Sequence, residues 1–95
     1  HVDDVIFFRI INGVIFAIPG DKKKYPLMEE TLSALEEQLD PRHFFRVNRS
    51  DIVNIRHIKS IQIEEGSDYT ILLKNSDEKI IVSQSRITQL KVWFA

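Results

Sequence analysis

The chain contains no cysteine, only three glycines and three prolines, and no apolar run of the length that crosses a membrane. The absence of cysteine excludes disulfides, thiolate nucleophiles and cysteine-ligated metal sites, and it is compatible with a reducing compartment. Three glycines are too few for a glycine-rich loop that cradles phosphates. The opening residues HVDD have neither the basic flank nor the apolar core of a signal peptide. We therefore expect a soluble, cytoplasmic protein.

Enzyme signatures are scarce as well. The histidines His1, His43 and His57 have no second histidine at i+3 or i+4, so the spacing of a zinc site is missing. No serine lies in the glycine context of a nucleophile elbow. The adjacent acids Asp3 and Asp4 would point to opposite faces of a strand, which does not suit an acid–base pair. The sequence therefore predicts a protein that is not an enzyme and needs neither a cofactor nor a metal ion.

The 95 residues, of which 43% are hydrophobic and 28% charged, suit one small globular domain. Polar turn clusters divide most of the chain into short strands, which we expect at residues 5–11, 14–18, 23–27, 58–63, 69–74 and 79–82. Asn12-Gly13 is a hairpin signal between the first two strands. Pro26 limits the third strand to the edge of a sheet.

Two helices are expected to interrupt the strands. The first begins after the candidate N-cap Thr31, carries leucines at helical spacing and ends at Asp40-Pro41. The second begins after Ser83, another candidate N-cap, and its apolar stripe consists of Ile87, Leu90 and Phe94. We interpret Trp93 and Phe94 as core residues. The predicted fold is mainly β, with one short helix in mid-chain and a short C-terminal helix.

Charge is segregated along a chain whose formal net charge is only −1. Between residues 42 and 59 a single acid, Asp51, accompanies five basic residues, which are Arg42, Arg46, Arg49, Arg56 and Lys59. A nearly neutral protein can have one basic side that attracts a polyanion. For this segment we favour nucleic acid as the partner, whereas the acidic residues between positions 28 and 40 are interpreted as a solvated face.

The segment FFRVNRSDIVNIRHIKSI, followed by TILLKN, IIVSQSR and a short terminal helix, resembles the LytTR DNA-binding domain of bacterial transcriptional regulators. The resemblance covers residues 1–95, and its most specific part is F-x-R-V-N-R-S-x-x-V-N-x-x-H-I. It implies elongated antiparallel β-sheets that bind imperfect direct repeats of double-stranded DNA through loops in the major groove. It also implies the C-terminal output module of a response regulator in a two-component system, behind a receiver domain or a membrane segment, with a dimer on DNA as one arrangement.

Carried over by position, the family's contact loops fall around Ile10 to Gly13, at residues 48–50 and at residues 83–86. The residues expected to contact DNA are Asn12, Asn48, Arg49, Ser50, Ser83, Gln84, Ser85 and Arg86. Ser85 departs from the family, because many members carry a basic residue there, and Arg86 is the obvious substitute. Candidate phosphate contacts are Lys22, Lys23, Lys24, Arg46, Arg56, His57 and Lys59. Arg49 has the planar fork that suits guanine or phosphate, and Asn48 can pair with adenine or phosphate.

Some of these residues also have a structural interpretation. Asn48 and Asn54 could each bond local backbone in a turn, which we favour for Asn54. Arg46 could pair with an acid, and His57 could order a turn. For the whole chain, the alternative is a non-catalytic interaction or sensory module that docks an acidic protein partner. Nonspecific binding to RNA or single strands is a third candidate.

Overall fold

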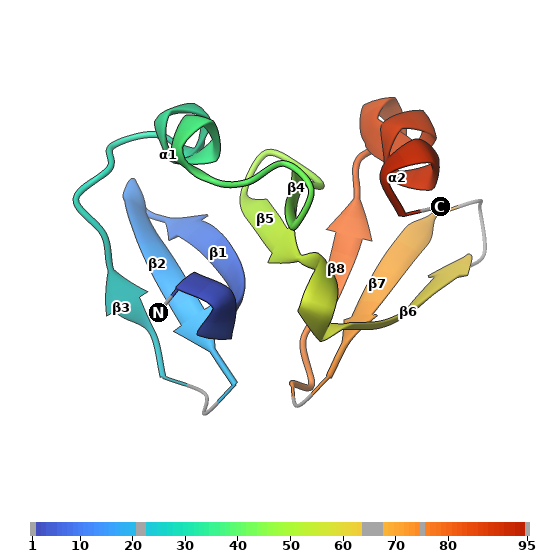
Figure 1. Cartoon of the computed structure of the whole chain (residues 1–95), viewed down its shortest axis with the longest axis horizontal. Helices are drawn as coiled ribbons and strands as arrows, with labels where there is room; N and C mark the ends of the chain where they lie inside the picture. Colours follow the sequence, from blue (N-terminus) through green and yellow to red (C-terminus); the bar gives the residue numbers. More distant parts are fainter. Residues whose placement is uncertain (1, 21–22, 64–67, 75, 95) are drawn as a thin grey trace.

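The computed structural model describes residues 2–20, 23–63, 68–74 and 76–94. Of these residues, 43% lie in strands and 28% in helices, which confirms the predicted mainly β fold. The strands form two antiparallel sheets that stand side by side in Figure 1. The molecule measures 35 × 26 × 25 Å and is therefore modestly elongated. Within the described ranges no helix is long and apolar enough to cross a membrane.

The first sheet has the strand order β3-β2-β1-β5-β4. Its strands are β1 (Val5–Ile11), β2 (Val14–Pro19), β3 (Tyr25–Pro26), β4 (Phe44–Arg46) and β5 (Asp51–Asn54). Asn12 and Gly13 join β1 to β2 with φ angles of 50° and 81°, the left-handed backbone that an Asn-Gly hairpin turn requires. β3 lies at the edge as predicted but is shorter than expected, since Pro26 has no N–H to extend the ladder.

The second sheet is the predicted meander, in the order β6-β7-β8. Its strands are β6 (Ile58–Ile63), β7 (Tyr69–Leu73) and β8 (Lys79–Val82). The 3₁₀ turn η2 (Ile55–His57) connects it to β5. Asn54 begins this turn, accepting the Arg56 N–H at 3.0 Å and donating to the carbonyl of Val5 at 3.0 Å. The turn-forming interpretation of Asn54 is therefore confirmed.

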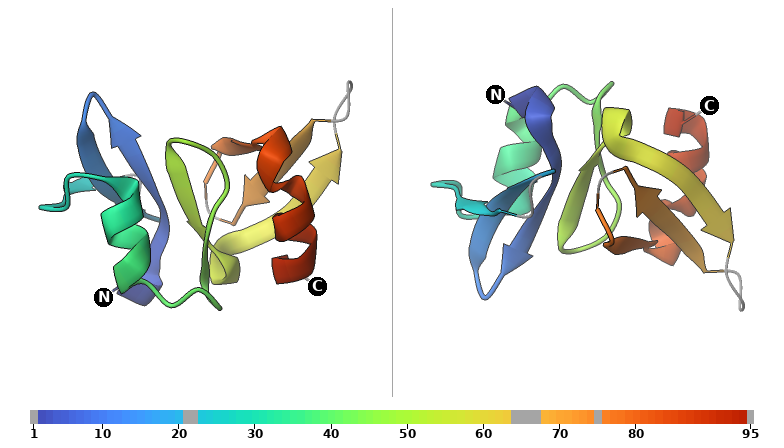
Figure 2. Two further views of the ribbon diagram at one scale, coloured as in Figure 1. Left: turned by 90° about the horizontal axis from the view of Figure 1, so that it is seen from above. Right: turned by 90° about the horizontal axis from the view of Figure 1, so that it is seen from below.

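Two α-helices lie on the same side of the sheets, as seen from above in Figure 2: α1 (Leu32–Gln38) at the first sheet and α2 (Ile87–Phe94) at the second. The Thr31 hydroxyl accepts the Ala34 N–H at 3.1 Å, which confirms the predicted N-cap. Ser83 stands at the predicted N-cap position, but its side chain makes no capping bond, and the segment begins as the 3₁₀ turn η4 (Gln84–Arg86) before α2. A further 3₁₀ turn, η1 (Val2–Asp4), opens the described chain.

The first sheet is buried on both faces, which explains the continuous apolar sequence of β1. Phe7 belongs to a core cluster shared with the second sheet and α2, whereas its neighbour Phe8 belongs to a cluster beneath α1. Successive side chains of a strand point to opposite faces, so one strand serves both clusters. Trp93 stacks on Phe45 with 5.1 Å between ring centroids. Phe94 stays 40% exposed at the end of α2, so its prediction as a core residue is wrong.

Candidate nucleic-acid interface

The β4–β5 loop, residues 47–50, contacts two segments from distant parts of the chain. The Ile10 N–H of β1 donates to the Ser50 carbonyl at 2.9 Å, and the Ser83 N–H donates to the Val47 carbonyl at 2.9 Å. A surface hollow there is lined by Arg9, Ile10, Asn48, Arg49, Ser50, Asp51, Lys79, Ile81 and Ser83. The structure therefore brings together two of the three predicted contact loops and the strand that leads to the third.

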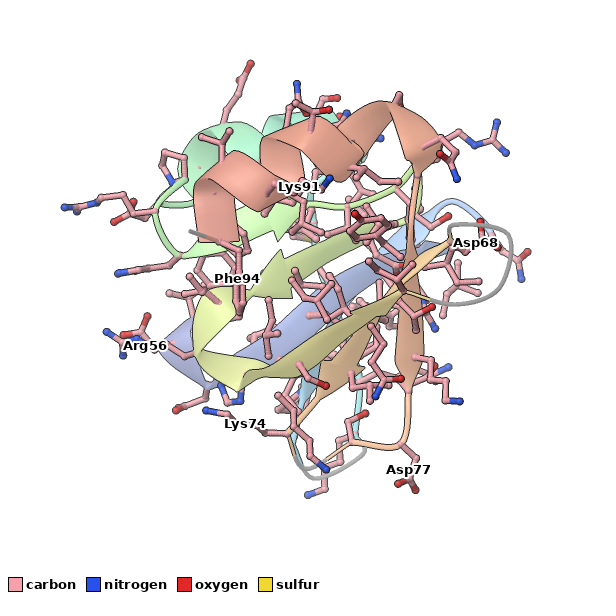
Figure 3. The ribbon with its side chains drawn as sticks, turned by 90° about the vertical axis from the view of Figure 1, so that its right-hand side faces the viewer. Arg56, Asp68, Lys74, Asp77, Lys91 and Phe94 are labelled. Atoms are coloured by element: carbon pink, nitrogen blue, oxygen red, sulfur yellow. The ribbon has the colours of Figure 1, made fainter. Side chains whose placement is uncertain are left out.

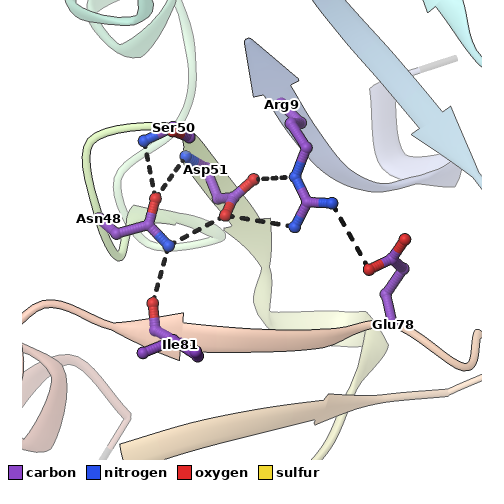
Figure 4. A network of polar contacts seen from close by, with 6 residues as sticks. All are labelled: Arg9, Asn48, Ser50, Asp51, Glu78 and Ile81. Atoms are coloured by element: carbon purple, nitrogen blue, oxygen red, sulfur yellow. Dashed lines mark hydrogen bonds and ion pairs between the residues drawn. The ribbon is translucent and has the colours of Figure 1, made fainter. Parts of the chain in front are cut away.

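The Asn48 side chain shapes this loop and uses its whole hydrogen-bonding capacity in doing so. Its oxygen accepts the N–H groups of Ser50 at 2.7 Å and Asp51 at 2.8 Å. Its nitrogen donates to Asp51 Oδ2 at 2.9 Å and to the Ile81 carbonyl at 2.7 Å (Figure 4). An amide side chain has two donors and two principal acceptor sites, so all four are occupied. Asn48 ties the loop to β5 and to β8.

Asp51 is the centre of a buried polar network. It is only 4% exposed, and Arg9 from β1 donates to both of its carboxylate oxygens, at 2.6 Å from Nε and 3.4 Å from Nη2 (Figure 4). Arg9 also reaches Glu78, at 3.5 Å. Burial lowers the pKa of the Arg9 guanidinium, but the Asp51 carboxylate, assisted by Glu78, outweighs this and leaves the pKa raised. The network thus fixes the loop against both sheets.

Arg46 supports the same loop from the side of α1. It donates to the main-chain carbonyls of Asn48 and Arg49, both at 3.3 Å, and to the Ser33 hydroxyl at 3.0 Å. The structural partner considered for Arg46 was an acid, but the partners found are carbonyl and hydroxyl oxygens. Its positive charge remains beside the loop, while its donors point inward.

Arg49 and Ser50 differ from these neighbours because both are exposed. Within the described residues, the Arg49 guanidinium and the Ser50 hydroxyl have no hydrogen-bond or ion-pair partner. A fixed backbone therefore presents a guanidinium whose five N–H donors are all available, which is the chemistry of bidentate recognition of guanine or phosphate.

The segment 83–86 is adjacent to the loop but only partly free. Ser83 is held through its main chain, and Gln84 and Ser85 are exposed. Gln84 makes a long hydrogen bond to Asp68, at 3.5 Å. Arg86 donates to the Arg46 carbonyl at 3.4 Å, so the expected substitute for the basic residue missing at position 85 is partly engaged in holding β4.

The remaining predicted residues lie elsewhere. Arg56 projects from the domain on the side opposite Asp68 (Figure 3), and since Gln84 contacts Asp68, Arg56 is remote from segment 83–86. Arg56 pairs with Asp3 at 3.9 Å, and the Nε2 of His57 lies 3.3 Å from the Asp3 carbonyl. Both therefore contact the N-terminal turn η1. Lys59 is exposed at the start of β6.

Asn12 of the first predicted contact loop and the three lysines either do not line the hollow or lie outside the described residues. Asn12 is exposed in the hairpin turn but does not line the hollow. The Lys24 ammonium lies 5.1 Å from the centroid of the Phe16 ring, and Lys23 is its neighbour in the chain. Lys22 lies outside the described residues. Among the residues that are described, no group of three or more histidine, aspartate or glutamate side chains could hold a metal ion.

Sequence reasoning missed Arg9 and Asp51, the two residues at the centre of the network. Each had a visible signal, because Arg9 is the one charged residue in an apolar strand and Asp51 is the one acid among five bases. Neither signal identifies the partner, since 42 positions separate the two residues.

Comparison with known proteins identifies the family of this chain. The family model of the LytTr DNA-binding domain matches residues 1–95. The chain belongs to this family. The sensory transduction protein LytT of Bacillus anthracis is 31% identical over 91 residues, which cover 96% of this chain and 36% of LytT. A protein of Staphylococcus aureus named as an uncharacterized HTH-type transcriptional regulator is 36% identical over 76 residues, covering 80% of this chain and 50% of that protein.

The fold also matches a solved member of the LytTr family. The LytTr DNA-binding domain of a methyl-accepting/DNA response regulator from Bacillus cereus superimposes with a TM-score of 0.88 at 23% sequence identity. The superposition covers 99% of this chain and 84% of that domain. The chain thus has the LytTr fold throughout, and it spans about a third to a half of the length of the curated relatives that it matches.

Proposed function

We propose that this chain binds double-stranded DNA sequence-specifically, as the effector domain of a cytoplasmic bacterial transcriptional regulator in a two-component system. Its input would come from a receiver domain or a membrane segment of the same protein. Family membership supports DNA as the binding partner. The regulatory context is supported by the names of the relatives, which include a sensory transduction protein and a response regulator. The single observation that carries the proposal is the free guanidinium of Arg49 on a loop that is braced from both sheets.

The contrast between two adjacent side chains assigns their roles. Asn48 has no donor or acceptor left for a base, so it positions the loop. Arg49 reads a base edge in the major groove or clamps a phosphate, and Ser50 and Ser83 hold phosphate oxygens. Exposed Gln84 and Ser85 extend the contact along the groove, with Arg86 and Asn12 at its margins. Two copies would occupy adjacent direct repeats, as a dimer on DNA.

The candidate phosphate contacts differ in their position relative to the β4–β5 loop. Arg46 adds positive charge behind the loop while its donors hold the loop carbonyls. Lys23 and Lys24 follow β2, from which they would graze the backbone. Arg56 and His57 contact the turn η1, and Lys59 lies close to them in the chain, at the start of β6. We therefore assign these three residues a minor share of DNA affinity.

A binding titration tests the proposal. The domain is titrated on duplex DNA selected from a random pool and on a scrambled duplex, at several salt concentrations. We expect preference for the selected duplex, carrying direct repeats, and a log–log salt slope of about −0.9 for each phosphate contact. Equal affinity for both duplexes, or affinity that does not change with salt, would overturn the proposal. Tighter binding to an acidic polypeptide than to either duplex would favour the interaction module instead.

A further inference from the structure

An exposed isoleucine lies in the middle of the candidate interface. Ile81 is 60% exposed, although its neighbours on β8, Ile80 and Val82, are 0% and 3% exposed and belong to the core cluster with α2. Side chains alternate between the faces of a strand, so Ile81 stands on the face of β8 away from that cluster. Its exposure results from this regular alternation and not from loose packing.

The position of Ile81 is tied to the β4–β5 loop. Its carbonyl accepts the Asn48 amide at 2.7 Å (Figure 4), and Ile81 lines the same hollow as Ile10, Arg49 and Ser50. Ile10 is fixed there as well, because its N–H donates to the Ser50 carbonyl. The Ile10 side chain packs against the core cluster beneath α1, so Ile81 is the exposed apolar residue beside the polar residues that are proposed to contact DNA.

The major groove offers one apolar group for such side chains. Each base pair presents hydrogen-bond donors and acceptors there, and thymine alone among the four bases adds a methyl group, at C5. Isoleucine is branched at Cβ and has few rotamers, so little conformational freedom is lost when it packs against a methyl group. A hollow with both a guanidinium and an isoleucine suits a guanine next to a thymine.

We infer that Ile81 is a specificity-determining residue, which contacts the C5 methyl of a thymine beside the base that Arg49 reads. This inference rests on the proposed function, and it adds a base preference that none of the polar residues would supply. The simpler interpretation is a solitary surface hydrophobe, which is common in soluble proteins. Ile63, 66% exposed on β6 and outside the hollow, represents that simpler case and is the matched control.

The test removes the methyl group from the DNA and the side chain from the protein. Duplexes selected by the parent domain are remade with single thymines replaced by deoxyuridine, which keeps base pairing and loses only the methyl group. At one thymine, affinity of the parent should fall about 4-fold, the effect of one buried methyl-sized group. Ile81→Ala should bind the thymine duplex more weakly and show no further loss with deoxyuridine. Ile63→Ala should keep the full 4-fold difference.

The outcomes separate this inference from the proposed function. If the parent domain prefers no duplex over scrambled DNA, the proposed function fails. If the parent is selective but indifferent to deoxyuridine at every thymine, the contact with a methyl group is excluded. If Ile81→Ala retains the parent's deoxyuridine sensitivity, Ile81 does not make the contact. Ile81→Thr keeps branching at Cβ but loses the Cγ1–Cδ1 arm, so it should show a reduced deoxyuridine difference if the alanine variant melts early. Thermal melts of all variants are the check on folding.

Discussion

Two arginine–aspartate pairs of the domain lie in regions that differ in almost every physical respect. Arg9 and Asp51 come from neighbouring strands, and their side chains are 25% and 6% exposed. Arg42 and Asp40 come from the link between α1 and β4, two positions apart in sequence, and their side chains are 84% and 33% exposed. Both pairs are close, with shortest N–O distances of 2.6 and 2.9 Å.

The difference lies in what surrounds each pair. A surface pair can exchange its partner for water at little cost, whereas a buried carboxylate without its partner has no such substitute. Asp51 also accepts from the Asn48 amide, so the buried pair extends into the β4–β5 loop. The Asp40 pair organises only its own link. A short distance alone therefore does not distinguish a pair that holds the β4–β5 loop in place from a pair that is exposed on the surface.

Replacing each aspartate by alanine should give the largest difference in stability between the two pairs. Asp51→Ala leaves Arg9 partly buried with only its long contact to Glu78. We therefore expect a loss of roughly 3 kcal/mol in the free energy of unfolding, at the lower end for buried pairs because Arg9 also keeps contact with solvent. Asp40→Ala should change it much less. Urea denaturation of the two variants beside the parent measures both values. Equal effects would show that the Asp51 network is as replaceable by water as the surface pair.

The next effect concerns DNA and compares two exposed arginines. Arg49→Ala should cost about 1–3 kcal/mol on the selected duplex and relax the preference at one base position if Arg49 reads a base. If it holds a phosphate, all sequences should weaken alike and the salt slope should fall by about 0.9. Arg56→Ala, on the other side of the domain, should leave binding nearly unchanged. Competition with single-base variants decides between these cases, and a larger loss for Arg56→Ala would relocate the interface.

Arg49→Lys separates the contribution of the positive charge from that of the planar guanidinium. Ammonium keeps the charge and loses the planar fork, so partial rescue on all sequences without recovery of the base preference is expected for a base-reading arginine.

A smaller effect tests whether Asn48 acts through Arg49. Asn48→Ala should weaken binding to the selected duplex, but in the Arg49→Ala background it should have little further effect, with a coupling of about 1 kcal/mol between the two positions. The four variants of this double-mutant cycle are compared by the same titration, and thermal melts confirm that each is folded. Strictly additive losses would mean that Asn48 contacts DNA independently of Arg49.

Local signals predicted most of the fold correctly. The Asn12-Gly13 turn, the Thr31 cap and the second meander each depend on residues close together in sequence, and each is confirmed. The errors occurred where a local signal competes with packing. Ser83 stands at the N-cap position, but its main chain is bonded to Val47, its side chain makes no capping bond and a 3₁₀ turn follows it. Phe94 continues the apolar stripe of α2, yet it is the last residue of that helix and stays 40% exposed.

The candidate site was less accessible to sequence reasoning for a similar reason. The motif around Asn48 and Arg49 indicated the loop, but not that one side chain is saturated with hydrogen bonds and the next is free. That distinction depends on Arg9 and on the Ile81 carbonyl, which lie 39 and 33 positions away from Asn48. Pairings over such separations follow from strand order, which hydrophobic periodicity does not specify.

The smallest expected effect comes from the surface pair and depends on pH. The side chain and main-chain N–H of Arg42 both donate to Asp40 and lower the pKa of its carboxyl from 3.8 to about 2. Because the pKa is lower in the folded state than in the unfolded chain, the pair stabilises the fold above about pH 4, and this contribution is lost as pH falls from 4 to 2. Asp40→Asn should therefore melt slightly below the parent at pH 7, and the difference should vanish near pH 2. High salt at pH 7 should reduce the difference as well, since the pair is exposed. A difference that persists at pH 2 would show that Asp40 acts through its hydrogen-bonding shape and not through its charge, which would narrow the contrast with Asp51.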